Sequence, residues 1–196
     1  DTALVEFTNS VMRVWINDVL LTRPAVTTTV TNGDFSGGGS WANLSEAGAV
    51  TSVGAGVLIL RSNAGGTAMA ITENTVTVAG ADIGVEHALR IVVGLGFVNL
   101  LVGSSSGGEQ YVSTTTLGTG THSISFTPTG DFYVRFTSLT QYESYLTQCT
   151  VEGSGVVTLP IPWTSSDLGK IRCDQSGDVV YVACVGYQQY KIERRG

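Results

Sequence analysis

Charged side chains are scarce in this sequence. They make up 13% of its 196 residues, against 42% for hydrophobic residues, and the formal net charge is −6. Lysine and arginine gather at one place, the C-terminal run of Lys191, Arg194 and Arg195. An acidic chain without a larger basic patch repels a phosphate backbone. The composition therefore argues against a nucleic-acid partner.

Long hydrophobic runs are also missing. Apolar runs such as residues 57–60 and 91–93 fall far short of the roughly 20 apolar residues with which a helix spans a bilayer. No membrane span is therefore predicted. The sequence opens at Asp1 without a methionine or a basic and apolar leader, which is typical of a mature product or of a fragment of a longer chain.

Cysteines are few and widely spaced. The three, Cys149, Cys173 and Cys184, form no Cys-x-x-Cys motif and have no pair of histidines nearby. We expect reduced thiols in a core. A disulfide or a ligand role is the less favoured alternative.

Residues that could carry catalysis are equally sparse. The two histidines, His87 and His122, are predicted to be satisfied surface residues, and no Gly-x-Ser-x-Gly elbow is present. The glycine-rich run 103–108 lacks the lysine of a phosphate loop. The 16 Asp and Glu residues offer many carboxylate pairs, but the sequence prefers none of them. We therefore expect neither an enzyme nor a cofactor, and keep a small hydrolase as a third possibility.

Alternation with period two is the dominant pattern that is present. It recurs at residues 4–7, 12–16, 122–126, 132–136 and 179–182, and glycine-rich turn signals separate such runs. Turn signals about 8 to 15 residues apart are typical of a two-sheet sandwich. We predict an all-β fold, with one short helical turn at residues 162–168, where hydroxyls and a carboxylate follow a proline.

Composition shifts along the chain predict two domains. The first 23 residues and the last 40 or so carry more bulky apolar and charged residues than the Gly/Thr/Ser-rich middle. Thr22-Arg23-Pro24 and Gly153-Ser154-Gly155 are the candidate borders. We expect a small split β scaffold from residues 1–26 and 156–196, whose two parts pair as one sheet, and an inserted sandwich domain from residues 27–155.

The stretch VTNGDFSGGGSW, residues 30–41, resembles the first-strand signature of jelly-roll carbohydrate-binding modules. In this interpretation Gly33 supplies an unusual backbone angle, Phe35 enters the core and Trp41 covers its open end. Residues 87–138 look like the later half of the same module: a strand, a glycine turn, a second strand, a loop and the run GTHSISFTPTGDFYVRF. The resemblance implies a jelly-roll β-sandwich.

The resemblance departs at the calcium site of that family. Members commonly end on a strand with an aspartate that helps to hold the ion, whereas residues 146–151 contain no carboxylate. Calcium takes about six or more oxygen ligands. Asp34, Glu46 and Glu143 could contribute, but we assign no metal.

A glycan-binding face needs aromatic rings that stack on the C–H faces of sugars, with polar groups for the hydroxyls. For Trp41 a role as a core lid is favoured over binding. Tyr142 and Tyr145 are better surface candidates because polar residues flank them. The candidate carbohydrate-binding residues are Trp41, Tyr111, Tyr142, Glu143 and Tyr145.

The end of the chain, WTSSDLGKIRCDQSGDVVYVACVGYQQYKIERRG, resembles a recurrent stretch of bacteriophage and prophage-like tail proteins, and LVEFTNSVMRVWINDVLL at its start resembles the strand pair that precedes it there. The match departs at Cys184-Val185-Gly186, where His-Pro is usual. The matching residues near the end are Leu168, Ile171, Arg172, Gln175, Ser176, Asp178, Val179, Tyr181, Tyr187, Lys191, Ile192 and Arg194.

This second resemblance implies an N-terminal fragment of a virion tail structural protein. Its partners would be other copies of itself and other tail proteins, and the jelly-roll module could touch glycans on the host surface. A homo-oligomer is expected. The alternative is a secreted carbohydrate-binding module of a glycoside hydrolase, which accounts for the middle of the chain but not for its ends.

Overall fold

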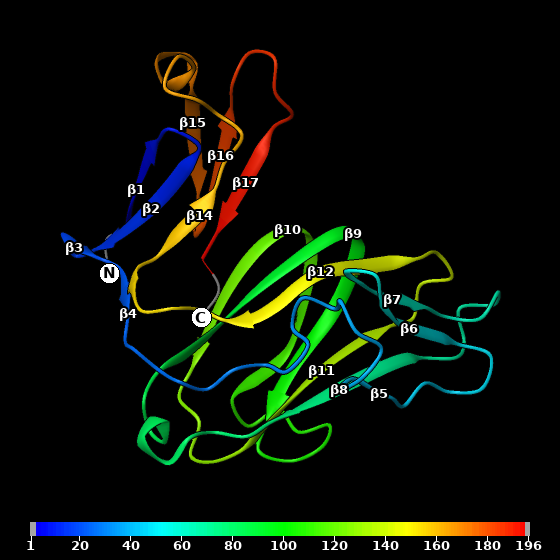
Figure 1. Cartoon of the computed structure of the whole chain (residues 1–196). Helices are drawn as coiled ribbons and strands as arrows, with labels where there is room; N and C mark the ends of the chain where they lie inside the picture. Colours follow the sequence, from blue (N-terminus) through cyan, green and yellow to red (C-terminus); the bar gives the residue numbers. More distant parts are fainter. Residues whose placement is uncertain (1–2, 195–196) are drawn as a thin grey trace. The chain divides into compact units, whose positions relative to one another are not determined.

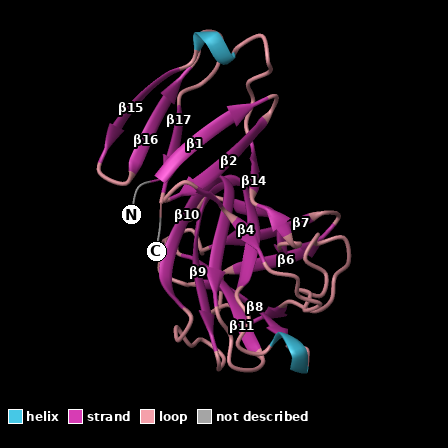
Figure 2. Ribbon diagram, turned by 90° about the vertical axis from the view of Figure 1, so that its left-hand side faces the viewer, coloured by secondary structure: helices cyan, strands magenta, loops and turns pink. Residues whose placement is uncertain are grey.

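The computed structural model describes residues 3–194 and is built of β-strands with two single-turn 3-10 helices, η1 (Gly80–Asp82) and η2 (Leu168–Lys170) (Figure 2). The predicted all-β fold, a jelly-roll sandwich inserted between strands of a small split scaffold, is confirmed. Within residues 3–194, no helix has the length and apolar character needed to cross a membrane. Arg195, grouped above with Lys191 and Arg194, lies outside the described residues.

The chain divides into two compact units. Arg23–Ser154 form one, called here the jelly-roll unit, and Asp1–Thr22 with Gly155–Gly196 form the other, called the smaller unit. Two connecting strands, β4 (Thr22–Arg23) and β13 (Gly155–Val156), pair with each other.

All strand pairs of the jelly-roll unit are antiparallel and follow the order β5-β8-β11-β9-β12-β7-β6, with β10 on the other edge of β9 (Figure 1). Antiparallel neighbours can be joined by short turns, which suits the many glycines of this segment. The strands are β5 (Ala42–Asn43), β6 (Val50–Gly54), β7 (Val57–Arg61), β8 (Ala70–Val76), β9 (His87–Gly103), β10 (Val112–Phe126), β11 (Phe132–Ser138) and β12 (Ser144–Val151).

Strand β9 belongs to both layers of this sandwich. Its residues 99–103 pair with β11, its residues 89–95 pair with β12, and β10 follows it along most of its length. One layer therefore contains β5, β8, β11 and the second half of β9, and the other contains β6, β7, β12 and the first half. Buried side chains from both layers meet in one hydrophobic core.

The residues of β9 that face the core switch from odd-numbered to even-numbered positions in the middle of the strand. Leu89, Ile91 and Val93 are buried before residues 94–97, and Val98, Leu100 and Val102 after them. A bulge at Gly94–Gly96 produces the change: the register with β10 and with β12 slips there. The predicted glycine turn between two strands is therefore wrong, because the glycines keep one bent strand continuous.

The Asn-Gly-Asp-Phe segment differs from its prediction at one glycine. The left-handed angles lie at Asn32 (φ 53°) and Phe35 (φ 55°), and Gly33 has no positive φ. A Cβ atom on Gly33 would overlap the carbonyl oxygen of Cys149, so close packing rather than an unusual angle requires glycine there. Phe35 is fully buried in the core, as predicted.

Several polar side chains lie elsewhere than predicted. His87 is 1% exposed, with its ring against Phe126 and Phe132, so its assignment to the surface is wrong. Its Nδ1 lies 2.9 Å from the carbonyl oxygen of Val85, a short-range partner that allows the ring to be buried. All three cysteines are free, but Cys173 is exposed on a small sheet rather than in a core.

The smaller unit contains two sheets instead of the single sheet predicted. β2 pairs with β14, which does join the two ends of the chain, but β15, β16 and β17 form a separate sheet. The strands are β1 (Ala3–Thr8), β2 (Val11–Ile16), β3 (Val19–Leu20), β14 (Thr158–Pro160), β15 (Arg172–Ser176), β16 (Val179–Ala183) and β17 (Tyr190–Glu193).

Trp163 holds the core of the smaller unit. Its indole is fully buried and meets the rings of Phe7 and Tyr190 edge-on, at centroid distances of 5.3 and 5.4 Å. Met12 and Val182, one from each sheet, belong to the same cluster. The two sheets therefore share one core although, within residues 3–194, no backbone ladder connects them.

The segment after Trp163 turns around Asp167. The Oδ2 atom of Asp167 accepts hydrogen bonds from the hydroxyl and backbone N–H of Thr164 (2.8 and 3.1 Å) and from the Tyr187 hydroxyl (2.8 Å). These bonds, that of the Thr164 side chain foremost, lower the pKa of Asp167. The same carboxylate raises the pKa of Tyr187. The helical turn was predicted at residues 162–168. In the structure, residues 164–167 form a turn that Asp167 closes, and the single-turn 3-10 helix η2 follows it from Leu168.

The Asp167 network predicts an acid-labile smaller unit. The pKa of Asp167 is about 3.8 without its partners and lower in the folded state, so the unfolded state takes up protons first as pH falls. Stability from this group is complete above the unfolded pKa and lost on acidification through the folded pKa. Asp167→Asn should lower the melting temperature at pH 7, and the difference from the wild-type protein should shrink by pH 3.

Differential scanning calorimetry at both pH values measures this effect, with Asp174→Asn on exposed strand β15 as the control. An Asp167→Asn melting temperature equal to that of the wild-type protein at pH 7 would contradict the prediction.

Candidate functional site

The outward face of the layer formed by β6, β7, β12 and the first half of β9 carries the candidate site. Leu58, Leu60 and Leu146 point into the core, so the alternate residues of these strands point outward. Tyr145 pairs with Ile59 on β7 and Leu95 on β9. Its ring rests on the backbone of β9 at Gly94: a Cβ atom there would overlap ring atom Cε2 and lie 2.9 Å from Cδ2.

An ion pair lies next to Tyr145. Ser144 pairs with Leu60, so its neighbour Glu143 lies beside Arg61, and Nη1 of Arg61 is 3.7 Å from Oε1 of Glu143. Both side chains are about half exposed (45% and 54%), so water screens the pair. This loose pairing leaves donors and acceptors free for a ligand.

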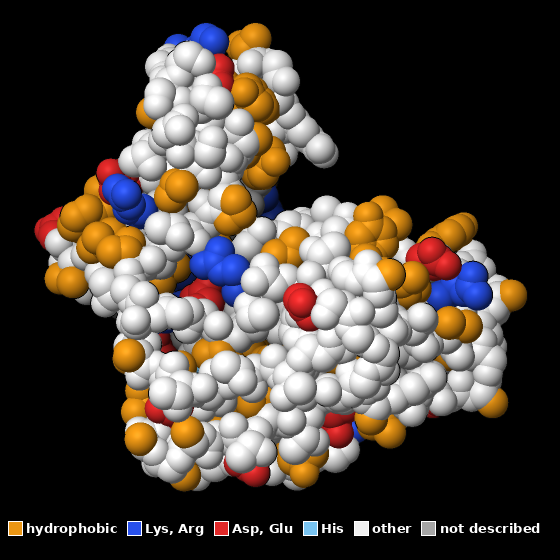
Figure 3. All heavy atoms as spheres, viewed as in Figure 1, with side chains coloured by type: hydrophobic (Ala, Val, Ile, Leu, Met, Phe, Trp, Pro, Cys, Tyr) orange, Lys and Arg blue, Asp and Glu red, His pale blue; other side chains and the backbone are white. Residues whose placement is uncertain are grey.

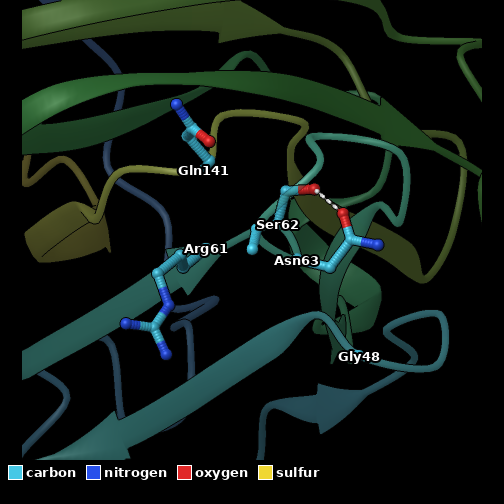
Figure 4. Close-up of a pocket in the computed structure, with 6 residues that line it drawn as sticks. Gly48, Arg61, Ser62, Asn63 and Gln141 are labelled. Carbon is cyan, nitrogen blue, oxygen red and sulfur yellow. Dashed lines mark hydrogen bonds between the residues drawn. The ribbon is translucent and has the colours of Figure 1, made fainter.

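A polar hollow of about 310 Å³ adjoins the ion pair (Figure 4). Arg61 and Gln141 lie on one side of it, and the Ser62 hydroxyl points toward the Asn63 amide, 3.3 Å from its oxygen (Figure 4). The lining residues are Gly48, Arg61, Ser62, Asn63, Ala64 and Gln141. Tyr142 follows Gln141 and is 73% exposed. The structure thus brings three of the five predicted residues together: Tyr142, Glu143 and Tyr145.

The other two predicted residues lie elsewhere. Trp41 is 6% exposed, with its ring against Phe35 and Phe136 and its Nε1–H donating to the carbonyl oxygen of Asn32 at 3.0 Å. The indole therefore offers no open face. Tyr111 stacks on Phe126, and its hydroxyl lies 2.9 Å from that of Thr129.

Four features of this surface escaped the sequence analysis: Arg61, Gly94, Leu95 and Phe97. Leu95 and Phe97 are half exposed (49% and 50%) on the bulge of β9, and Phe97 pairs with Gly118 of β10. The sequence feature that marks this surface is the Gly-Leu-Gly-Phe run of residues 94–97, which interrupts an apolar strand. Because the run predicts a glycine turn, Leu95 and Phe97 are not expected on the outward face of a strand.

The placement of arginines singles out Arg61. The jelly-roll unit, described throughout, contains no lysine and four arginines. Arg23 and Arg90 pair with buried Glu152, and Arg135 pairs with buried Glu73, all with side chains less than a quarter exposed. Arg61 is therefore the exposed cation of this unit. On the face shown in Figure 3, few charged side chains interrupt the neutral surface.

The possible calcium ligands do not converge. Within residues 3–194, no group of three or more His, Cys, Asp or Glu side chains is placed to hold a metal ion. Asp34 accepts hydrogen bonds from Ser36, which lower its pKa, while Glu46 accepts from the backbone N–H of Met69 and Glu143 pairs with Arg61.

Comparisons with known proteins give distant likenesses only. No protein-family model and no curated protein matches the chain. One similar solved structure is a mutant from a study of ligand recognition by family 29 carbohydrate-binding modules: identity is 13%, the TM-score is 0.40, and the match covers 66% of this chain and 88% of that one. Another is a second mutant of a family 29 carbohydrate-binding module, with 12% identity, a TM-score of 0.36, and coverage of 78% and 92%. The candidate site rests on the contacts of this chain alone.

The exposed ion pair should contribute little to folding. Arg61→Ala and Glu143→Ala should each change the free energy of unfolding by less than about 1 kcal/mol, since solvent screens a half-exposed pair. Urea titration followed by circular dichroism measures this. Arg135→Ala serves as a contrast: it leaves buried Glu73 without its cation and should cost about 3–5 kcal/mol. Equal losses in all three variants would show that Arg61 and Glu143 support the fold.

Proposed function

We propose that the jelly-roll unit binds a glycan chain on the surface around Tyr145. The observation that carries the proposal is the Tyr145 ring lying on the backbone of Gly94, beside the exposed Arg61–Glu143 pair. An aromatic face binds the C–H face of a pyranose ring, and neighbouring polar groups bind its hydroxyls. A ring supported by the sheet loses little freedom when a sugar stacks on it.

The polar surroundings of the ring support this ligand class. The hollow beside Arg61 offers the exposed amide of Gln141, whereas the Ser62 hydroxyl and the Asn63 amide hydrogen-bond within the 62–68 turn. Along β12, Gln148 lies on the same outward face, because its neighbour Cys149 is buried inward. Uncharged amides and hydroxyls beside an aromatic ring suit binding rather than reaction, and we propose no catalytic role.

The smaller unit is proposed to anchor this module in a phage or prophage-like tail, in contact with other copies of the chain and other tail proteins. The sequence resemblance at residues 163–194 is the support for this part. Residues on which that resemblance depends also organise the fold: Ile171, Tyr187 and Ile192 pack on the Trp163 cluster. The location in a virion follows from the same argument.

A secreted carbohydrate-binding module of a glycoside hydrolase is the alternative. The compactness of Arg23–Ser154 favours it, since a module that contacts mainly itself could be attached to many partners. This alternative does not account for the smaller unit.

Loss of the Tyr145 ring should weaken glycan binding strongly. On a glycan array, Tyr145→Ala should bind its best ligand at least tenfold more weakly than the wild-type chain, a difference of about 1.4 kcal/mol. Tyr181→Ala, which removes an exposed tyrosine from the smaller unit, is the matched control and should bind normally. A wild-type chain that binds no glycan, or a Tyr145→Ala variant that binds as well as the wild-type, would overturn the proposed site.

The tail assignment has a separate test. Gold-labelled antibodies against the chain should decorate the tails of particles purified from the producing cells, as seen by negative-stain electron microscopy. Label confined to the culture medium, together with the wild-type glycan binding described above, would favour the secreted module.

A further inference from the structure

Two glycines of the β9 bulge differ in what they do. Gly96 has a φ of +72°, and a Cβ atom there would lie 2.6 Å from the Ser144 hydroxyl, so the bent backbone itself requires glycine. Gly94 has no positive φ, so its backbone conformation is open to any residue. The contact that excludes a side chain at Gly94 is the ring of Tyr145.

We propose that Gly94 is a positioning residue for the glycan site, an inference that rests on the function proposed above. Without a side chain, Gly94 lets the Cδ2–Cε2 edge of the Tyr145 ring approach β9, and the half-buried ring keeps part of its surface open to a sugar. The nearest atoms around a Cβ atom at Gly94 all belong to this ring: Cε2, Cδ2 at 2.9 Å and Cζ at 3.2 Å. A single methyl group therefore has to displace the ring.

The smallest test is Gly94→Ala in the full chain. The Tyr145 ring remains, but it has to leave the sheet, and binding should weaken about tenfold. The probes are cellohexaose, mannohexaose, chitohexaose and maltohexaose, measured by isothermal titration calorimetry. Gly118→Ala is the matched control. Gly118 also lies in a strand with no positive φ, but a Cβ atom there meets nothing within 4 Å, so Phe97 opposite it stays in place.

A double-mutant cycle on stability separates positioning from damage to the fold. Gly94→Ala should lower the melting temperature of the wild-type chain but not that of Tyr145→Ala, where the obstructing ring is gone. Equal losses in both backgrounds would show that Gly94 serves the backbone of β9, and the proposal would fall.

Proton NMR checks the geometry without any ligand. A nuclear Overhauser effect should connect an Hα proton of Gly94 with the Tyr145 ring protons, because a Cβ atom at Gly94 would overlap ring atom Cε2, and it should vanish in Tyr145→Ala. A wild-type chain without this effect would overturn the proposed arrangement.

The outcomes separate the two proposals. Binding that Tyr145→Ala abolishes and Gly94→Ala leaves intact overturns the role of Gly94 alone. A wild-type chain that binds none of the four hexasaccharides and no glycan on the array overturns the proposed function, and the role of Gly94 in it, even where the NMR contact between Gly94 and Tyr145 is present.

Discussion

The bulge in β9 is the constraint on which the jelly-roll unit depends. A strand that passes through both layers of a sandwich has to present its apolar side chains to one core from two directions. Because side chains alternate strictly along a strand, this requires a slip of register, which the bulge at Gly94–Gly96 provides. The same slip exposes Leu95 and Phe97, and Gly94 leaves no side chain between β9 and the Tyr145 ring. The bend and the candidate site are therefore one feature.

The arginines of the jelly-roll unit are used mainly inside it. Arg23 and Arg90 both contact Glu152, whose carboxylate also accepts a hydrogen bond from Ser123. A buried carboxylate needs such partners, because an unpaired charge is costly to desolvate. The consequence is a surface of hydroxyls, amides and carboxylates with one exposed cation, Arg61.

Part of the site was accessible from the sequence. The polar residues that flank Tyr142 and Tyr145 indicated that both rings are at the surface. Arg61 and Gly94 were not accessible, because they are about 80 and 50 positions away along the chain and approach Tyr145 only through the pairing of β12 with β7 and β9. Trp41 shows that a local signal can also fail to choose between two roles. Its aromatic character fits a binding face and a core equally, and only its packing against Phe35 and Phe136 decides.

The sequence by itself determined the all-β class, because period-two alternation and frequent turn residues are local properties. It also indicated the entry of Phe35 into a core, and a turn near Trp163 that Asp167 closes through neighbours three residues away. Tertiary structure alone decided that β9 is one bent strand, that the smaller unit has two sheets, and that His87 is buried. Each of these depends on which distant strands meet, and the free energy of that choice resides in a shared core rather than in any local stretch.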